Sequence, residues 1–112
     1  NSLIQSIATN IHGAGVVLGQ PITNWRELDI PSAKCELKLD GVSVGTGQGS
    51  DVDGHPVEPM IWIANAINAM GGSLKKGDIV ITGSMIPPIE VKPGMKATLQ
   101  MDLLGEITLD IE

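Results

Sequence analysis

The clearest hydrophobic pattern runs from Gly54 to Ser84 and predicts a long helix followed by a short strand. Pro59 has no amide donor and fits the first turn of a helix, so we expect the helix to run from Val57 to Met70. Apolar residues recur along it at helical spacing, which predicts a stripe that packs on a sheet, formed by Met60, Ile63, Ile67 and Met70. The apolar run 79–81 then predicts a buried strand.

Alternating residues on both sides of Asp40-Gly41 predict a β-hairpin. Cys35, Leu37 and Leu39 alternate with charged neighbours, as in a strand with one wet face, and Asp-Gly favours the positive backbone angles of a tight turn. The glycines that follow, at positions 45, 47 and 49, predict a bent edge strand or a crossing between sheets. We assign them a structural role, because no phosphate-binding helix opens directly after them.

Other periodic segments complete the predicted topology. Strands are predicted at 99–101 and 107–111, joined by a turn, and a short strand at 16–18. Helical spacing of four apolar residues near the start predicts a helix that ends at Gly13: Leu3, Ile4, Ile7 and Ile11. Residues 22–32 predict either one turn of helix or a loop. The fold class is therefore α+β, mostly β, in a single domain over residues 1–112.

Composition restricts the function classes. The chain has 112 residues, no Phe or Tyr and two Trp, so its core has to be aliphatic. The formal net charge of -6 and the lack of a basic stripe interleaved with aromatics exclude nucleic acid as a partner. The single Cys35 cannot form an internal disulfide, and neither a signal peptide nor an apolar run of membrane-spanning length is present, so we expect a cytoplasmic location and no membrane partner.

Few residues suggest chemistry by their spacing. Asp51, Asp53 and His55 could point three metal ligands to one side of an extended backbone, but a polar turn that caps the next helix is the more frequent use of such residues. His12 could act as a general base, although no partner is evident nearby. Cys35 is expected to be a small core side chain, and Lys75-Lys76 a solvated turn.

Ser84 is the strongest binding candidate among the residues. It follows Thr82-Gly83 at the end of the predicted strand, where a glycine lets backbone amides approach a ligand and a hydroxyl can bind a carboxylate oxygen. The alternative is an ordinary turn serine, and composition does not separate the two.

Three motifs carry a resemblance to a known family. They are Gly54-His55-Pro56, Trp62-Ile63-Ala64-Asn65, and the stretch from Leu74 through Lys75-Lys76-Gly77-Asp78 to Thr82-Gly83-Ser84. The chain resembles the C-terminal half of the 2-oxopent-4-enoate hydratase and oxalocrotonate decarboxylase group, in the fumarylacetoacetate hydrolase superfamily. The similarity extends from about Ile7 to Gly105.

The resemblance implies a mixed β-sheet roll with the long helix packed on it, and a lyase that binds Mg or Mn with a small 2-oxo or enol carboxylic acid. Its substrate residues would correspond here to Thr82, Gly83 and Ser84, with Asn10 near the same pocket. The family is implied to hold its metal through carboxylates upstream of the matched part. No metal ligand and no cofactor are therefore assigned within this chain, and its catalytic residues are unknown.

Two departures affect the expected activity. Where the family has Asp before Asn10, this chain has Thr9, and the serine expected just after it is replaced by His12-Gly13. We expect the C-terminal portion of a metal-dependent hydratase or decarboxylase, inactive alone and assembled as a homo-oligomer. The alternative is a stand-alone binding or oligomerising domain that keeps the same β-roll.

Overall fold

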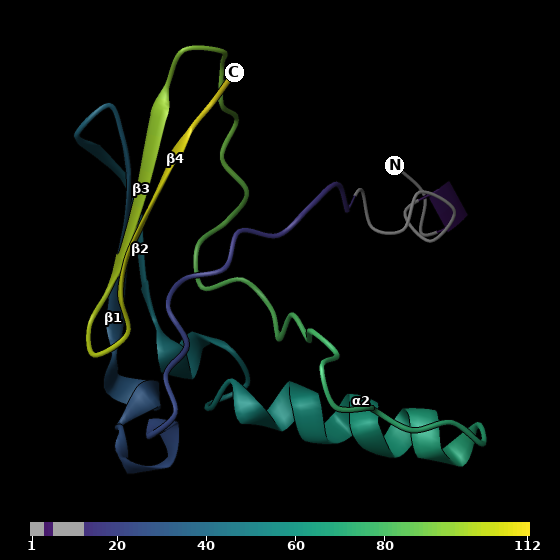
Figure 1. Ribbon diagram of the computed structural model, residues 1–112. Helices are drawn as coiled ribbons and strands as arrows, with labels where there is room; N and C mark the ends of the chain where they lie inside the picture. Colours follow the sequence, from purple (N-terminus) through teal and green to yellow (C-terminus); the bar gives the residue numbers. More distant parts are fainter. Residues whose placement is uncertain (1–3, 6–12) are drawn as a thin grey trace.

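A computed structural model describes residues 4–5 and 13–112 and shows an α+β arrangement (Figure 1). Four strands form one sheet in the order β2-β1-β3-β4, and every pairing is antiparallel. Within these residues the sheet is thus antiparallel rather than mixed, and the complete roll stays a prediction. No helix in the described part of the chain is long and apolar enough to cross a bilayer.

The predicted hairpin at Asp40-Gly41 is confirmed. β1 (Lys34–Leu39) and β2 (Val42–Gln48) pair across a turn in which Asp40 and Gly41 have φ angles of 49° and 81°. The register shifts between Leu37 and Lys38, so the outer strand is bent by a bulge. β2 has no strand on its outer side, which confirms the bent edge expected from its glycines.

The second predicted pair is also confirmed, as β3 (Lys96–Met101) and β4 (Gly105–Asp110). The registers place like residues on one face, because directly opposed residues point to the same side. The apolar face carries Cys35, Leu37, Leu99 and Ile107, and the polar face carries Lys34, Glu36, Thr46, Gln48 and Gln100. The expectation of one wet face is therefore met across three strands.

Two extended segments cover part of the apolar face. A Cβ on Gly45 would overlap the Ile86 side chain, and one on Gly47 would overlap the carbonyl oxygen of Met85. Gly19 lies over β4, where its Cβ would stand 3.2 Å from Ile107 Cδ1. The glycines of β2 thus admit another backbone at close range, which explains their presence in a strand.

The core formed by these layers is small. Four apolar residues are buried in the described chain: Ala33, Cys35, Leu39 and Val52. They lie along β1 and next to three short 3-10 turns, η2 (Trp25–Glu27), η3 (Ile30–Ser32) and η4 (Gly49–Asp51). The segment 22–32 therefore contains helical turns, which was one of its two predicted states.

The long helix is confirmed as α2 (Val57–Ala69), with Pro59 in its first turn and Gly71 (φ 85°) after its last. Its expected packing on the sheet is not observed, however. None of its residues is buried, Met70 of the predicted stripe is 79% exposed, and the helix axis runs away from the sheet (Figure 1). The other three residues of the stripe, Met60, Ile63 and Ile67, are half-buried, so the described chain covers the stripe in part, but not with the sheet.

Two predicted strands are not formed. Residues 16–18 and 79–81 are extended but pair with no strand in the described chain. Their apolar composition is that of buried strands, and what they lack is a neighbour to complete the hydrogen bonds. The predicted N-terminal helix lies largely outside the described residues, although Ile4 and Gln5 are helical.

Candidate functional site

The predicted substrate turn, Thr82-Gly83-Ser84, lies beside the loop between η4 and α2. Gly83 has a φ of 125°, a conformation that side chains disfavour, and its Cβ would meet Val52 Cγ1 at 3.4 Å. Val52 is buried, whereas Ser84 is exposed. The turn is therefore anchored through Gly83, with the Ser84 side chain in contact with solvent.

Asn10, the fourth predicted substrate residue, and His12 lie outside the described residues. The proximity of Asn10 to Ser84 hence stays a prediction. The structure brings Thr82, Gly83 and Ser84 together only as chain neighbours.

Two of the three proposed metal ligands, Asp51 and His55, act as caps. Asp51 Oδ2 accepts a 2.8 Å hydrogen bond from the Gln48 amide, and His55 Nδ1 accepts a 3.0 Å bond from the Val57 amide at the start of α2. These bonds satisfy amides that the helical turns leave free. The described residues contain no group of three or more His, Cys, Asp or Glu placed to hold a metal ion.

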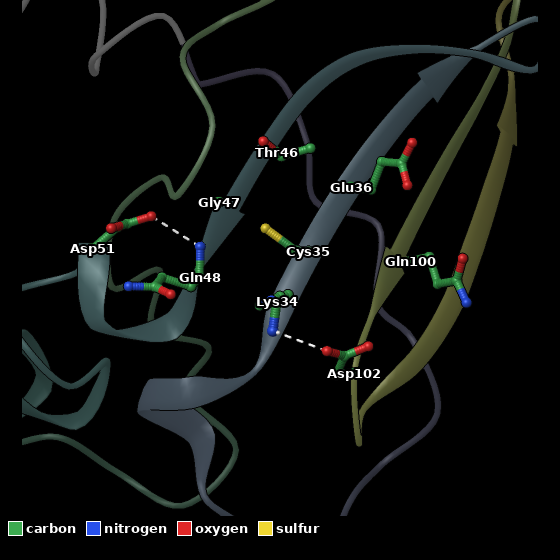
Figure 2. A pocket seen from close by; sticks show the side chains of 9 residues that line it. All are labelled: Lys34, Cys35, Glu36, Thr46, Gly47, Gln48, Asp51, Gln100 and Asp102. Carbon is green, nitrogen blue, oxygen red and sulfur yellow. Dashed lines mark hydrogen bonds between the residues drawn. The ribbon is translucent and has the colours of Figure 1, made fainter.

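A polar cavity of about 490 Å³ opens on the polar face of the sheet, the face that carries Lys34, Glu36 and Thr46 (Figure 2). Its walls come from β1, β2, β3 and the adjoining turns, and are formed mainly by Lys34, Glu36, Thr46, Gln48, Gln100 and Asp102. Asp51 stands at one end, where it accepts the Gln48 bond. Asp102 Oδ2 stands at the other and accepts a 3.3 Å bond from the Lys34 amide. Two of its three carboxylates are therefore engaged by the backbone.

This cavity and the substrate turn are separate. Thr82, Gly83 and Ser84 do not line it, and Met85, just after them, lies against Gly47 on the apolar side. Sequence reasoning did not identify the cavity. The Asp40-Gly41 turn alone would place Lys34 opposite Gly47 and Glu36 opposite Gly45. The register shift between Leu37 and Lys38 brings Gln48 and Thr46 to these places instead, and the turn does not predict it. The remaining groups can form hydrogen bonds, but they do not make a nucleophile with its base.

Cys35 is buried, with 3% of its surface exposed. Burial raises the pKa of its thiol above the ordinary value of 9.0, the Gly47 backbone hydrogen bond opposes this, and the charge of Asp51 adds to it. A buried thiol that resists ionisation is a poor nucleophile, which agrees with the expected role as a core side chain.

Comparisons with known proteins give consistent matches over most of the chain. A 2-hydroxyhexa-2,4-dienoate hydratase from Comamonas testosteroni is 29% identical over 104 residues, which are 93% of this chain and 39% of that protein. A 2-keto-4-pentenoate hydratase from Dechloromonas aromatica is 30% identical over 105 residues, or 94% of this chain and 40% of its own length. The chain thus spans about two-fifths of these relatives, in their C-terminal part. No family model matches it.

A solved structure agrees with the sequence matches. The 4-oxalocrotonate decarboxylase of Pseudomonas putida G7, complexed with calcium and acetate, superposes with a TM-score of 0.72 at 25% identity. The superposition covers 78% of this chain and 34% of the decarboxylase. The same enzyme is also known complexed with magnesium and adipate. The expected resemblance to the C-terminal part of the hydratase and decarboxylase group is therefore confirmed.

Proposed function

We propose, from the premise that the chain matches the C-terminal part of hydratases and a decarboxylase, that it is the C-terminal portion of a metal-dependent 2-oxo acid lyase. The observation that carries this is the joint match in sequence and fold: 91–97% of the chain aligns with the hydratases, and the decarboxylase superposes at a TM-score of 0.72. Hydration of a dienol acid and loss of a carboxylate both fit this match.

The described residues do not fit the divalent ion that such a lyase would use. No set of three potential ligands gathers among them, and Asp51 already accepts a hydrogen bond from the Gln48 amide. Magnesium and calcium prefer several anionic oxygens in one place. In this proposal the ligands come from polypeptide outside the described residues, so the chain alone catalyses neither reaction.

The contribution of this chain is the substrate side of the site. Ser84 presents an exposed hydroxyl and Gly83 a backbone amide, both able to donate to one carboxylate. The contact of Gly83 with Val52 keeps the turn in place. The acid group of the substrate would be held here, with its reacting carbons directed away from the turn.

Binding of oxalate, a small dicarboxylate without reactive carbons, tests this role by chemical-shift titration. We expect weak saturable binding to the chain and a loss of at least about tenfold in Ser84→Ala, since a hydrogen bond to a charged group contributes about 1.5–3 kcal/mol. Ser73→Ala is the matched control, because Ser73 is also an exposed serine in the segment after α2. Its affinity should not change.

The same preparation should not hydrate 2-hydroxypenta-2,4-dienoate when Mg²⁺ or Mn²⁺ is added. Hydration would be detected as a loss of the dienol absorbance. Turnover by the chain alone would show that its own residues hold the metal. Equal oxalate affinity of Ser84→Ala and the unaltered chain, or no binding by either, would remove the turn from the substrate site.

A further inference from the structure

Two stretches of this chain have the composition of buried strands but are strongly exposed over part of their length. Residues 13–25 and 79–89 contain no Asp, Glu, Lys or Arg. Their large apolar side chains are 49–72% exposed at five positions: Val16, Val17, Leu18, Ile79 and Ile81. We call these five residues, which lie on two separate segments of the chain, the open layer.

The backbone of the open layer is as unpaired as its side chains. In the described chain, no hydrogen bond is made by any residue from 13 to 23 or from 79 to 91. Extended apolar backbone in this state is a template for strand pairing, and proteins that leave such edges in solvent usually protect them with charges or bulges. The open layer has neither protection, which indicates that another polypeptide segment buries it in the functional protein.

The solvent-accessible area of the chain indicates whether a second copy or a larger polypeptide buries the open layer. The chain exposes 8506 Å², whereas a compact monomer of its mass exposes about 5,900 Å². The difference, about 2,600 Å², is some three times what one partner contributes to a standard interface, about 800 Å². An excess of this size is typical of the interior of one domain. A second copy would also bring another formal charge of -6.

We propose that the open layer is completed by strand addition, and that the added strands come from a polypeptide equivalent to the three-fifths of the hydratases that have no counterpart in this chain. This rests on the proposed function. The alignments cover only 39–40% of those relatives, so polypeptide of ample length remains for such a role. Whether it belongs to the same polypeptide or to another, the pairing mode is the same: backbone bonds to 16–18 and 79–81, with their side chains buried.

Strand addition at 79–81 also acts on the substrate turn. Ile81 precedes Thr82 directly, while on the other side of the turn Gly83 lies near Val52 and Met85 lies against Gly47. A strand paired along 79–81 would fix the direction in which Ser84 points. The added polypeptide thus supplies metal ligands and also orients the carboxylate-binding hydroxyl.

Co-expression tests the assignment. The probe is the N-terminal, unmatched part of the Dechloromonas aromatica hydratase carrying an affinity tag, produced together with the complete 112-residue chain. We expect the two to co-purify as a 1:1 complex by native mass spectrometry. Val17→Asp and Ile81→Asp should each reduce the recovered complex at least about tenfold, because each would place a charge in a buried strand pair.

Val42→Asp is the matched control. Val42 is 66% exposed, but its backbone already pairs within the sheet, so the same substitution there should leave the complex intact. Circular dichroism of each variant chain alone should match the unaltered chain, since these side chains are exposed in it.

The outcomes separate the inference from the proposed function. A 1:1 complex that is sensitive at Val17 and Ile81 but does not hydrate the dienol acid would support the strand addition and remove the proposed function. A homodimer of the chain disrupted by the same two substitutions would overturn the choice of occupant. Co-purification lost equally in Val42→Asp, or no complex at all, would overturn the open layer as the pairing surface.

Discussion

The four-stranded sheet and the open layer are built from similar residues, yet in the described chain the strands of the sheet are paired and the open layer is not. Each hairpin of the sheet brings its partner strand after a turn of two or three residues, at Asp40-Gly41 and at residues 102–104. Residues 16–18 and 79–81 have strand composition but no partner strand in the described chain. The difference shows that apolar composition favours an extended strand, but that a β-strand forms only where a neighbouring strand is available to pair with it.

Burial follows the same division. Three of the four buried apolar residues, Ala33, Cys35 and Leu39, lie in or beside β1, which has a strand on each side. Helix α2 has no buried residue, although its sequence forms the helix as expected. Helix formation needs only local hydrogen bonds, but burial of an apolar stripe needs a second surface. The stability of the chain should therefore reside in the sheet.

Removing side chains from the two regions should give the largest contrast. Leu39→Ala should lower the free energy of unfolding by about 2–4 kcal/mol, because it leaves a cavity beside β1, where Leu39 is 8% exposed. Ile81→Ala should change it by less than about 0.5 kcal/mol, because Ile81 is 72% exposed. Urea unfolding followed by circular dichroism gives both values. Equal losses would mean that the open layer contributes to the core of the isolated chain.

A smaller effect is expected where the two regions touch. Gly47→Ala places a methyl group against the Met85 carbonyl oxygen and should destabilise the chain by about 1–3 kcal/mol or displace the segment after Ser84. Gly15→Ala is the control, since its Cβ would meet no atom within 4 Å. Urea midpoints compare the two, and an unchanged midpoint for Gly47→Ala would mean that residues 85–86 do not rest on β2.

The smallest effect is a pH dependence confined to the sheet. The pKa of the Cys35 thiol is raised in the folded chain, so the unfolded chain loses this proton first as the pH rises. Below pH 9.0 the thiol is protonated in both the folded and the unfolded chain, so its full contribution to the free energy of unfolding is present. Above pH 9.0 the unfolded chain ionises first, and the free energy of unfolding falls. The urea midpoint should decline between about pH 8 and about pH 10, and Cys35→Ala should flatten the decline. Identical slopes would contradict a raised thiol pKa.

Sequence reasoning predicted the elements whose signals are local. The Asp-Gly turn, the glycines of the edge strand and the proline at the start of α2 each determine backbone geometry within a few residues, and all three were confirmed. Predictions that needed distant contacts failed: the strand at 79–81 and the packing of α2 on the sheet. Their apolar patterns show that the side chains should be buried, but not which surface buries them.

The candidate site divides in the same way. Gly83 and Ser84 were chosen from sequence because a glycine lets backbone amides approach a ligand and a hydroxyl can bind a carboxylate oxygen; the structure gives Gly83 a φ of 125°. The family resemblance pointed to the same turn, and the substrate role of Ser84 stays a proposal. The polar cavity of Figure 2 was missed because it depends on the register of three strands, which single-strand alternation does not reveal.

Amide hydrogen exchange on the isolated chain tests the central claim most directly. If the open layer lacks its partner, amides of 16–18 and 79–81 should exchange as fast as in an unfolded peptide. Amides of β1, the strand that has β2 on one side and β3 on the other, should be slower by at least about a hundredfold. Protection of 16–18 and 79–81 comparable to that of β1 would show that the chain completes its own second layer, and would contradict the account.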